Sequence, residues 1–147
     1  MEMLKLVALD DEDLQIISAH LQDAVLKVGD LDYFQREKRF VAVANRFVWE
    51  RAEAGRAARR TFERRRSVLH FDRVTAVKVH GVDRSRKDEV LSLLALRFLP
   101  GEAPAGVVEF TFSGDAAIRL DVECIEAKLT DLGSAWEARG KPAHDDA

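Results

Sequence analysis

Two runs of alternating apolar residues, joined by a short turn, constrain the fold of this chain more than any other feature. The apolar positions are Val108, Phe110 and Phe112 in VVEFTF, and Ile118, Leu120 and Val122 in AAIRLDV. Ser113-Gly114-Asp115 lies between the two runs. A period of two places the apolar side chains on one face of each strand, and a glycine-containing turn between such runs is typical of a β-hairpin. The sequence therefore predicts an antiparallel hairpin over residues 107–122.

Similar patterns predict strands along much of the remaining chain. These strands are expected near residues 4–8, 24–29, 39–50, 67–82 and 89–100. Residues 67–82 are long enough for one bent strand or for two short ones. Because most connections are short, consecutive strands are expected to pair antiparallel. The count is about seven strands.

Two helices are predicted at opposite ends of the chain. Asp10 suits an N-cap, and the acidic residues that follow it suit the positive end of a helix dipole. Leu14, Ile17 and Leu21 then recur at helical spacing, which predicts a helix near residues 11–22. A second stripe, spaced three and four residues apart, predicts a closing C-terminal helix near residues 122–136. Its members are Val122, Ile125, Leu129, Leu132 and Trp136.

These elements predict a mainly β or α+β fold: about seven mostly antiparallel strands in a barrel or strongly bent sheet, with the two helices. The order resembles the pleckstrin-homology-like barrel superfold, in which seven antiparallel strands precede a C-terminal helix. The helix near residues 11–22 departs from the simplest version of that superfold. A two-layer α+β sandwich is the alternative. Such barrels bind lipids, peptides, RNA or other subunits, so this resemblance selects no function.

Length and composition favour one soluble domain. A chain of 147 residues predicts a single compact domain over residues 1–138, followed by a polar tail over 139–147. Cys124 is the only cysteine, which excludes an intrachain disulfide and a multi-cysteine metal site. The N-terminal residues lack the features of a secretory signal, and no apolar run approaches the ~20 residues of a membrane span. We therefore expect a cytoplasmic protein without a membrane partner.

The segment from Arg51 to Arg66, hereafter the arginine segment, departs most from ordinary composition. Seven of its sixteen residues are arginine, although the whole chain has a net charge of −3. The candidate anion- or partner-binding residues are Arg56, Arg59, Arg60, Arg64, Arg65 and Arg66. The segment fits either an exposed loop or a short surface helix.

Three interpretations of the arginine segment remain open. It can dock a protein partner or a second copy of this chain, and this interpretation is favoured because charge is segregated along the sequence. It can bind nucleic acid or another polyanion, although nucleic-acid-binding domains are usually basic overall and this chain has a pI near 5.8. It can also be a solvated surface without a specific partner.

Asn45 and Arg46 interrupt an otherwise apolar strand, so they are candidate polar residues of a pocket. A bulge or hydrogen bonding across the sheet is the favoured explanation for Asn45, because buried polar groups need partners. Nucleotide-binding, hydrolase and zinc-protease motifs are absent from the sequence. We therefore predict no catalytic residues, no metal site and no cofactor, and expect a non-enzymatic protein.

Three stretches carry a resemblance to a known family. They are LVALDDEDLQIISAHLQDAVLKVGDLDY, RFVAVANRFVWE and RRRSVLHFDRV. Together they resemble an uncharacterised family of short bacterial proteins, defined as a domain of unknown function. The resemblance implies a bacterial cytosolic protein and supplies no activity and no site residue.

Overall fold

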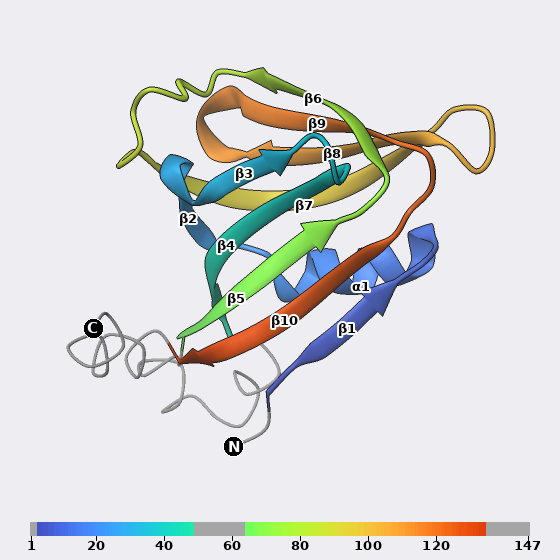
Figure 1. Cartoon of the computed structure of the whole chain (residues 1–147). Helices are drawn as coiled ribbons and strands as arrows, with labels where there is room; N and C mark the ends of the chain where they lie inside the picture. The colour runs from blue at the N-terminus through green and yellow to red at the C-terminus, as the bar shows by residue number, and fades with distance from the viewer. Residues whose placement is uncertain (1–2, 49–63, 135–147) are drawn as a thin grey trace.

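The computed structural model describes residues 3–48 and 64–134 (Figure 1). They form one antiparallel sheet of ten strands, with one short α-helix and two 3₁₀ turns. The strands are β1 (Lys5–Ala8), β2 (Val25–Lys27), β3 (Leu31–Phe34), β4 (Arg39–Phe47), β5 (Arg64–Phe71), β6 (Val74–His80), β7 (Val90–Pro100), β8 (Gly106–Phe112), β9 (Ala116–Val122) and β10 (Ala127–Ser134). The mainly β prediction is confirmed.

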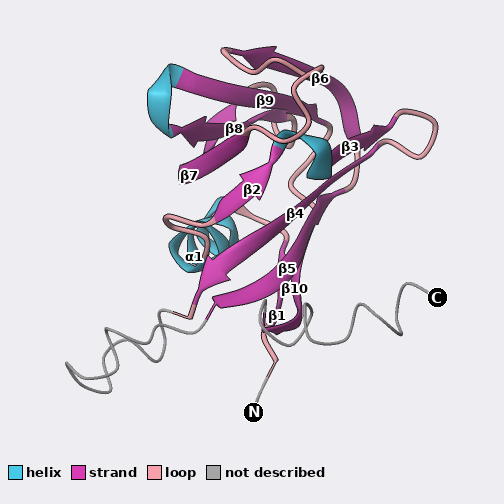
Figure 2. Cartoon of the chain, turned by 90° about the vertical axis from the view of Figure 1, so that its left-hand side faces the viewer, coloured by secondary structure: helices cyan, strands magenta, loops and turns pink. Residues whose placement is uncertain are grey.

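The sheet is open. Its strand order is β1-β10-β5-β4-β2-β7-β8-β9-β6, and β3 pairs with the side of β4. The end strands β1 and β6 do not pair with each other, so the barrel alternative is wrong. We call β1, β10, β5, β4 and β3 the β4 half, and β7, β8, β9 and β6 the β8 half. The two halves lie one above the other, and the short β2 lies between them (Figures 1 and 2).

The core fills the space between the two halves. Phe110 of β8 lies 5.7 Å, centroid to centroid, from both Phe40 of β4 and Phe71 of β5, in edge-to-face geometry. Phe112 stacks on Phe110 at 6.2 Å. Edge-to-face aromatic pairs contribute about 0.5–1.5 kcal/mol beyond the burial of their area. These rings therefore join strands that are distant in the sheet.

The helix α1 (Asp11–His20) forms where the sequence predicts it, although it ends at His20 rather than at residue 22. The Asp10 side chain accepts a hydrogen bond from the Asp13 backbone N–H at 2.8 Å, as an N-cap does. The helix contacts β1 in one half and β7 in the other. Ser18 lies on its buried side, and its Oγ accepts the backbone N–H of Leu96 at 3.0 Å. Over its described residues, the chain has no helix with the length and apolar character needed to cross a bilayer.

The predicted hairpin over residues 107–122 is confirmed. β8 and β9 pair antiparallel from Gly106↔Val122 to Phe112↔Ala116. The 3₁₀ turn η2 (Ser113–Asp115) joins them, with positive φ at Gly114 (75°) and Asp115 (63°). Such φ angles suit glycine and are tolerated by aspartate.

The predicted helix near residues 122–136 is wrong over its described part, because Ala127–Ser134 is the strand β10. Ala127, Leu129 and Asp131 alternate as buried residues, and Lys128 and Leu132 are exposed. A charged residue at an inward position hides the period of two, so the apolar spacing of three and four residues suggested a helix instead. Residues 135 and 136 lie outside the described residues.

Candidate functional site

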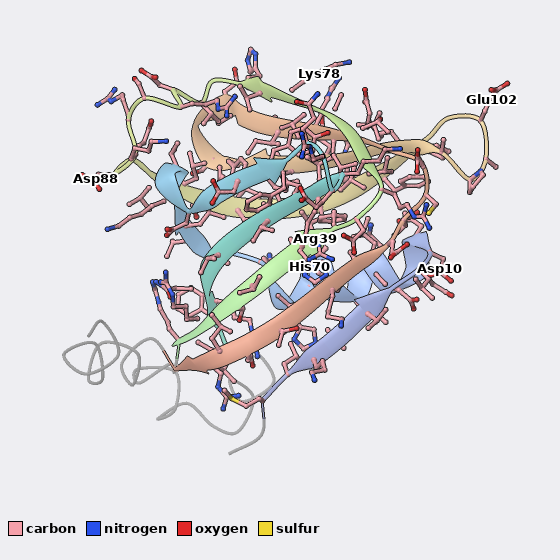
Figure 3. All side chains as sticks on the ribbon, in the orientation of Figure 1. Asp10, Arg39, His70, Lys78, Asp88 and Glu102 are labelled. Carbon is pink, nitrogen blue, oxygen red and sulfur yellow. The ribbon has the colours of Figure 1, made fainter. Side chains whose placement is uncertain are left out.

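A row of four charged side chains crosses the outer face of the β8 half. Backbone pairing aligns Arg97 of β7 with Glu109 of β8, Glu109 with Arg119 of β9, and Arg119 with Lys78 of β6. Paired residues of antiparallel strands have Cβ atoms about 4.5–5.5 Å apart, so long side chains along the row can meet. Lys78 points outward from β6 (Figure 3).

Glu109 is the anchor of this row. Arg97 donates to Oε1 of Glu109 from Nη2 at 2.6 Å and from Nε at 3.2 Å, and Arg119 donates to Oε2 from Nε at 2.9 Å. The Glu109 side chain is only 8% exposed, whereas those of Arg97 and Arg119 are 59% and 57% exposed. The hydrogen bond from Arg97 lowers the pKa of Glu109. Burial raises this pKa, but the hydrogen bond from Arg119 also lowers it, so the pKa stays below its usual value. One buried carboxylate thus holds two solvent-facing guanidinium groups in place.

The row lines a hollow of about 700 Å³, hereafter the basic hollow. Its charged lining consists of Lys78, Arg97 and Arg119 against Glu109 and Asp115, and His80 lies at its side. Its apolar lining consists of Val79, Phe112, Ala116 and Ala117. The Ala117 side chain is short, so the longer charged side chains of the lining extend further from the sheet than it does.

The basic hollow retains unused hydrogen-bond donors. Arg97 Nη1 and both Nη atoms of Arg119 donate no hydrogen bond to any described residue. Lys78 Nζ lies 3.5 Å from Asp121 Oδ2 and is otherwise open to solvent. Guanidinium forks match carboxylate and phosphate oxygens, and arginines that are already held in place lose little side-chain entropy when they bind an anion. The arrangement can therefore accept an anionic group.

The described members of the arginine segment point in different directions. Arg64 lies over the ring of Phe47, with its Cζ 4.4 Å from the ring centroid. Arg65 is buried, and Arg66 is half-buried on the opposite face of β5. Arg56, Arg59 and Arg60 lie outside the described residues. The structure thus brings no two of these candidate arginines into one described site.

Arg65 and Arg46 meet in a buried ion cluster around Asp131. Arg46 donates to Asp131 from Nε at 2.9 Å and Nη2 at 2.8 Å, and Arg65 Nη1 lies 3.4 Å from Oδ2. The Ser67 hydroxyl donates to Oδ1 at 2.6 Å, and the Leu4 backbone N–H donates to Oδ2 at 2.9 Å. Arg46, which the sequence suggests as a pocket residue, therefore holds β4 to β10 inside the protein.

Asn45 lies on the other face of β4, away from Arg46. It pairs with Arg66 of β5 and with Val25 of β2. These three residues line a cavity of about 290 Å³, hereafter the Asn45 cavity. The Asn45 Oδ1 atom is buried and accepts no hydrogen bond from any described residue. The structure thus brings Asn45 and Arg66 together and separates both from Arg46.

His70 and Arg39 lie close together on the β4 half (Figure 3), and both lie near Asp72. Arg39 Nε donates to Asp72 Oδ1 at 2.7 Å, and His70 Nε2 lies 3.8 Å from Asp72 Oδ2. Burial lowers the pKa of His70, and Asp72 opposes this shift. Within residues 3–48 and 64–134, no group of three metal-ligating side chains gathers.

The basic hollow has a signal in the sequence that the strand patterns alone do not reveal. Arg97, Glu109 and Arg119 are each a charged residue flanked by apolar residues inside a predicted strand. Alternating signs on three consecutive antiparallel strands favour cross-strand ion pairs. The signal needs the register of β7 against β8, and that register shifts at a bulge between Leu93 and Ala95.

Comparison with known families covers nearly the whole chain. A family model described as a protein of unknown function (DUF2948) matches residues 4–144. The chain belongs to the DUF2948 family. Searches of curated proteins and of solved structures found no match. Membership of DUF2948 confirms the resemblance to an uncharacterised family, and the family description supplies no activity.

Proposed function

We propose that this DUF2948 chain is a non-enzymatic interaction module of the bacterial cytoplasm. Its partner would be a protein that presents acidic side chains, and the basic hollow would receive them. The observation that carries the proposal is the pair of half-exposed guanidinium groups of Arg97 and Arg119, both fixed by the buried Glu109.

The lining of the basic hollow favours a protein partner over a nucleic acid. Three basic and two acidic side chains line it, so its positive excess is small. Nucleic-acid sites gather many cations along a phosphate backbone, and their domains are usually basic. Val79 and Ala117 instead offer apolar contact to the methylene groups of a glutamate or aspartate side chain. A second copy of this chain is one such partner, because Asp10, Asp11 and Glu12 are exposed at the start of α1.

Fluorescence anisotropy with short labelled peptides tests the proposal. A peptide of alternating glutamate and glycine should bind, and binding should weaken with added salt because exposed charges are screened. The same peptide with glutamine in place of glutamate should not bind. Light scattering at low and high salt reports self-association of the chain in the same buffers.

Matched variants localise the binding. The triple variant Arg97→Gln, Glu109→Gln, Arg119→Gln replaces the row by amides that can hydrogen-bond to one another, so the buried position keeps partners. Arg36→Gln combined with Arg86→Gln removes two exposed charges elsewhere. Loss of peptide binding in the triple variant alone supports the proposal. Equal binding by both variants would refute it.

The arginine segment supports a second candidate, the binding of nucleic acid or another polyanion. Seven arginines in sixteen residues are the observation that favours it. Labelled RNA and DNA oligomers should then bind at low salt, and charge reversal at Arg56, Arg59 and Arg60 should abolish binding. Absence of binding at ~50 mM salt, where phosphate contacts are strong, would exclude this candidate.

A further inference from the structure

Backbone pairing between the two halves of the sheet is sparse next to Asn45. β2 pairs with β4 only at Val25↔Asn45, but it pairs with β7 at three positions. After β2, the chain turns away from β4 through the 3₁₀ turn η1 (Val28–Asp30). It then pairs with β4 again as β3. The Asn45 cavity lies where β2 and β4 make this single pair.

The Asn45 cavity combines an apolar wall with polar groups of both signs. Its apolar residues are Val25, Leu26, Val43 and Val90, and its polar residues are Lys27, Asp30, Asn45 and Arg66. A volume of about 290 Å³ lies just below the roughly 300–1,000 Å³ range of small-molecule sites. The cavity therefore suits a small ligand that has an aliphatic part and charges of both signs.

Two polar side chains of the cavity have groups without a hydrogen-bond partner in the part of the chain that the structure describes. The Asn45 Oδ1 atom is a buried acceptor without a donor. Leaving such an acceptor unsatisfied costs about 1–3 kcal/mol, and a ligand N–H group could recover this energy. Arg66, its pairing partner on β5, is half-buried, and its side chain has no hydrogen bond or ion pair with a described residue, whereas the neighbouring Arg65 is bound to Asp131.

We propose that the Asn45 cavity binds a free aliphatic α-amino acid. The ligand carboxylate would accept hydrogen bonds from Arg66, with Lys27 adding positive charge. The ligand ammonium group would donate to Asn45 Oδ1 and face the Asp30 carboxylate. The aliphatic side chain would pack against Val25, Val43 and Val90. This site is independent of the basic hollow, which lies on the β8 half.

Isothermal titration calorimetry with L-leucine and two analogues tests the proposal. 4-Methylpentanoate lacks the ammonium group of leucine, and 3-methylbutylamine lacks its carboxylate. Leucine should bind with one site per chain, and each analogue should bind at least tenfold more weakly. No saturable binding of leucine at millimolar concentration would overturn the proposal. Equal affinity for leucine and 4-methylpentanoate would also overturn it, because the site would then recognise only a carboxylate.

Variants assign the binding to this cavity. Asn45→Val removes the unsatisfied acceptor, so the variant should be at least as stable as the parent and yet bind leucine at least tenfold more weakly. Arg66→Gln should weaken leucine binding in the same way, whereas Arg64→Gln, which changes the neighbouring arginine over Phe47, should not. NMR shifts of the Val25, Val43 and Val90 methyl groups should follow the leucine titration. Leucine binding that is unchanged in both cavity variants would refute the proposal.

Discussion

Arg46 and Asp131 form a bidentate ion pair from which solvent is fully excluded. Nε and Nη2 of Arg46 lie 2.9 and 2.8 Å from Oδ1 and Oδ2 of Asp131, and both side chains are 0% exposed. The same carboxylate accepts hydrogen bonds from Ser67 of β5 and from the backbone N–H of Leu4, next to β1. Asp131 therefore ties four segments of the β4 half to one another.

The Asp131→Asn substitution should strongly destabilise the protein. An amide cannot balance the charge of the guanidinium groups around it, and breaking a buried ion pair costs about 3–5 kcal/mol. Urea denaturation should show a loss of this size in the free energy of unfolding. Asp88→Asn, which changes an exposed loop carboxylate (Figure 3), should be nearly neutral. Equal midpoints for the two variants would contradict a stabilising role for the ion cluster.

Stability should depend on pH through Asp131. Burial opposes ionisation of this carboxyl, but hydrogen bonds from Arg46, Ser67 and the Leu4 N–H outweigh it and lower its pKa from 3.8 to about 2. The folded state thus binds this proton less tightly than the unfolded state. The contribution of Asp131, about 2 kcal/mol, is therefore fully present above about pH 4 and is lost as the pH falls toward 2.

Urea midpoints measured between pH 5 and pH 2 check this pH dependence. Part of the acid sensitivity should remain in Asp131→Asn, because the pKa of Glu109 is also lowered. The parent should nevertheless lose more stability across this interval than the variant. Parallel curves for the two proteins would show that the Asp131 pKa is not lowered by folding.

The Glu109→Gln substitution should release the two arginines of the basic hollow. The neutral amide attracts Arg97 and Arg119 less strongly, and the guanidinium groups on either side then repel each other. Relaxation of the arginine Nε–Hε signals in NMR should show faster motion of both side chains, with a stability loss of about 1–3 kcal/mol. Glu102→Gln, at an exposed loop position (Figure 3), serves as the control. Unchanged arginine signals would mean that Glu109 does not position them.

The Gly106→Ala substitution should destabilise the start of β8. A Cβ at Gly106 would lie 2.6 Å from the Leu99 carbonyl oxygen and 2.6 Å from the Phe98 ring. The carbonyl belongs to the paired strand β7 and cannot move freely, so we expect a loss of about 1–3 kcal/mol in thermal or urea unfolding. Gly101→Ala is the matched control, since its nearest contact would be 3.5 Å. A neutral Gly106→Ala would indicate that β7 and β8 separate easily at this end.

The hairpin of β8 and β9 could be predicted from sequence because its inward positions are all apolar and its turn contains glycine. The strand β10 could not, because its inward positions include Asp131, whose burial depends on Arg46 and Ser67 from other strands. The short β3 was also missed, because the polar sequence around Tyr33 resembles a turn and its pairing with β4 adds only four residue pairs. Local patterns lack this information, because the partners are distant in sequence.

The candidate sites follow the same logic. Asn45 stands out in the sequence as a polar residue among apolar ones, and the structure indeed gives it a buried atom beside a cavity. Arg46 stands out in the same way and Arg65 belongs to the arginine segment, yet strand alternation turns both toward Asp131. The basic hollow depends on the lateral alignment of four strands, and one of these alignments passes a bulge that no single-strand pattern reveals.

The narrow junction at β2 has a thermal consequence. Backbone pairing passes from β4 to β2 through the single pair Val25↔Asn45, whereas Phe110 packs against both Phe40 and Phe71 across the interior. The association of the two halves thus depends more on hydrophobic packing than on strand pairing. Such contact weakens on cooling, whereas the ladders within each half are less affected. Cooling should therefore weaken the packing between the β4 half and the β8 half and leave each half internally ordered.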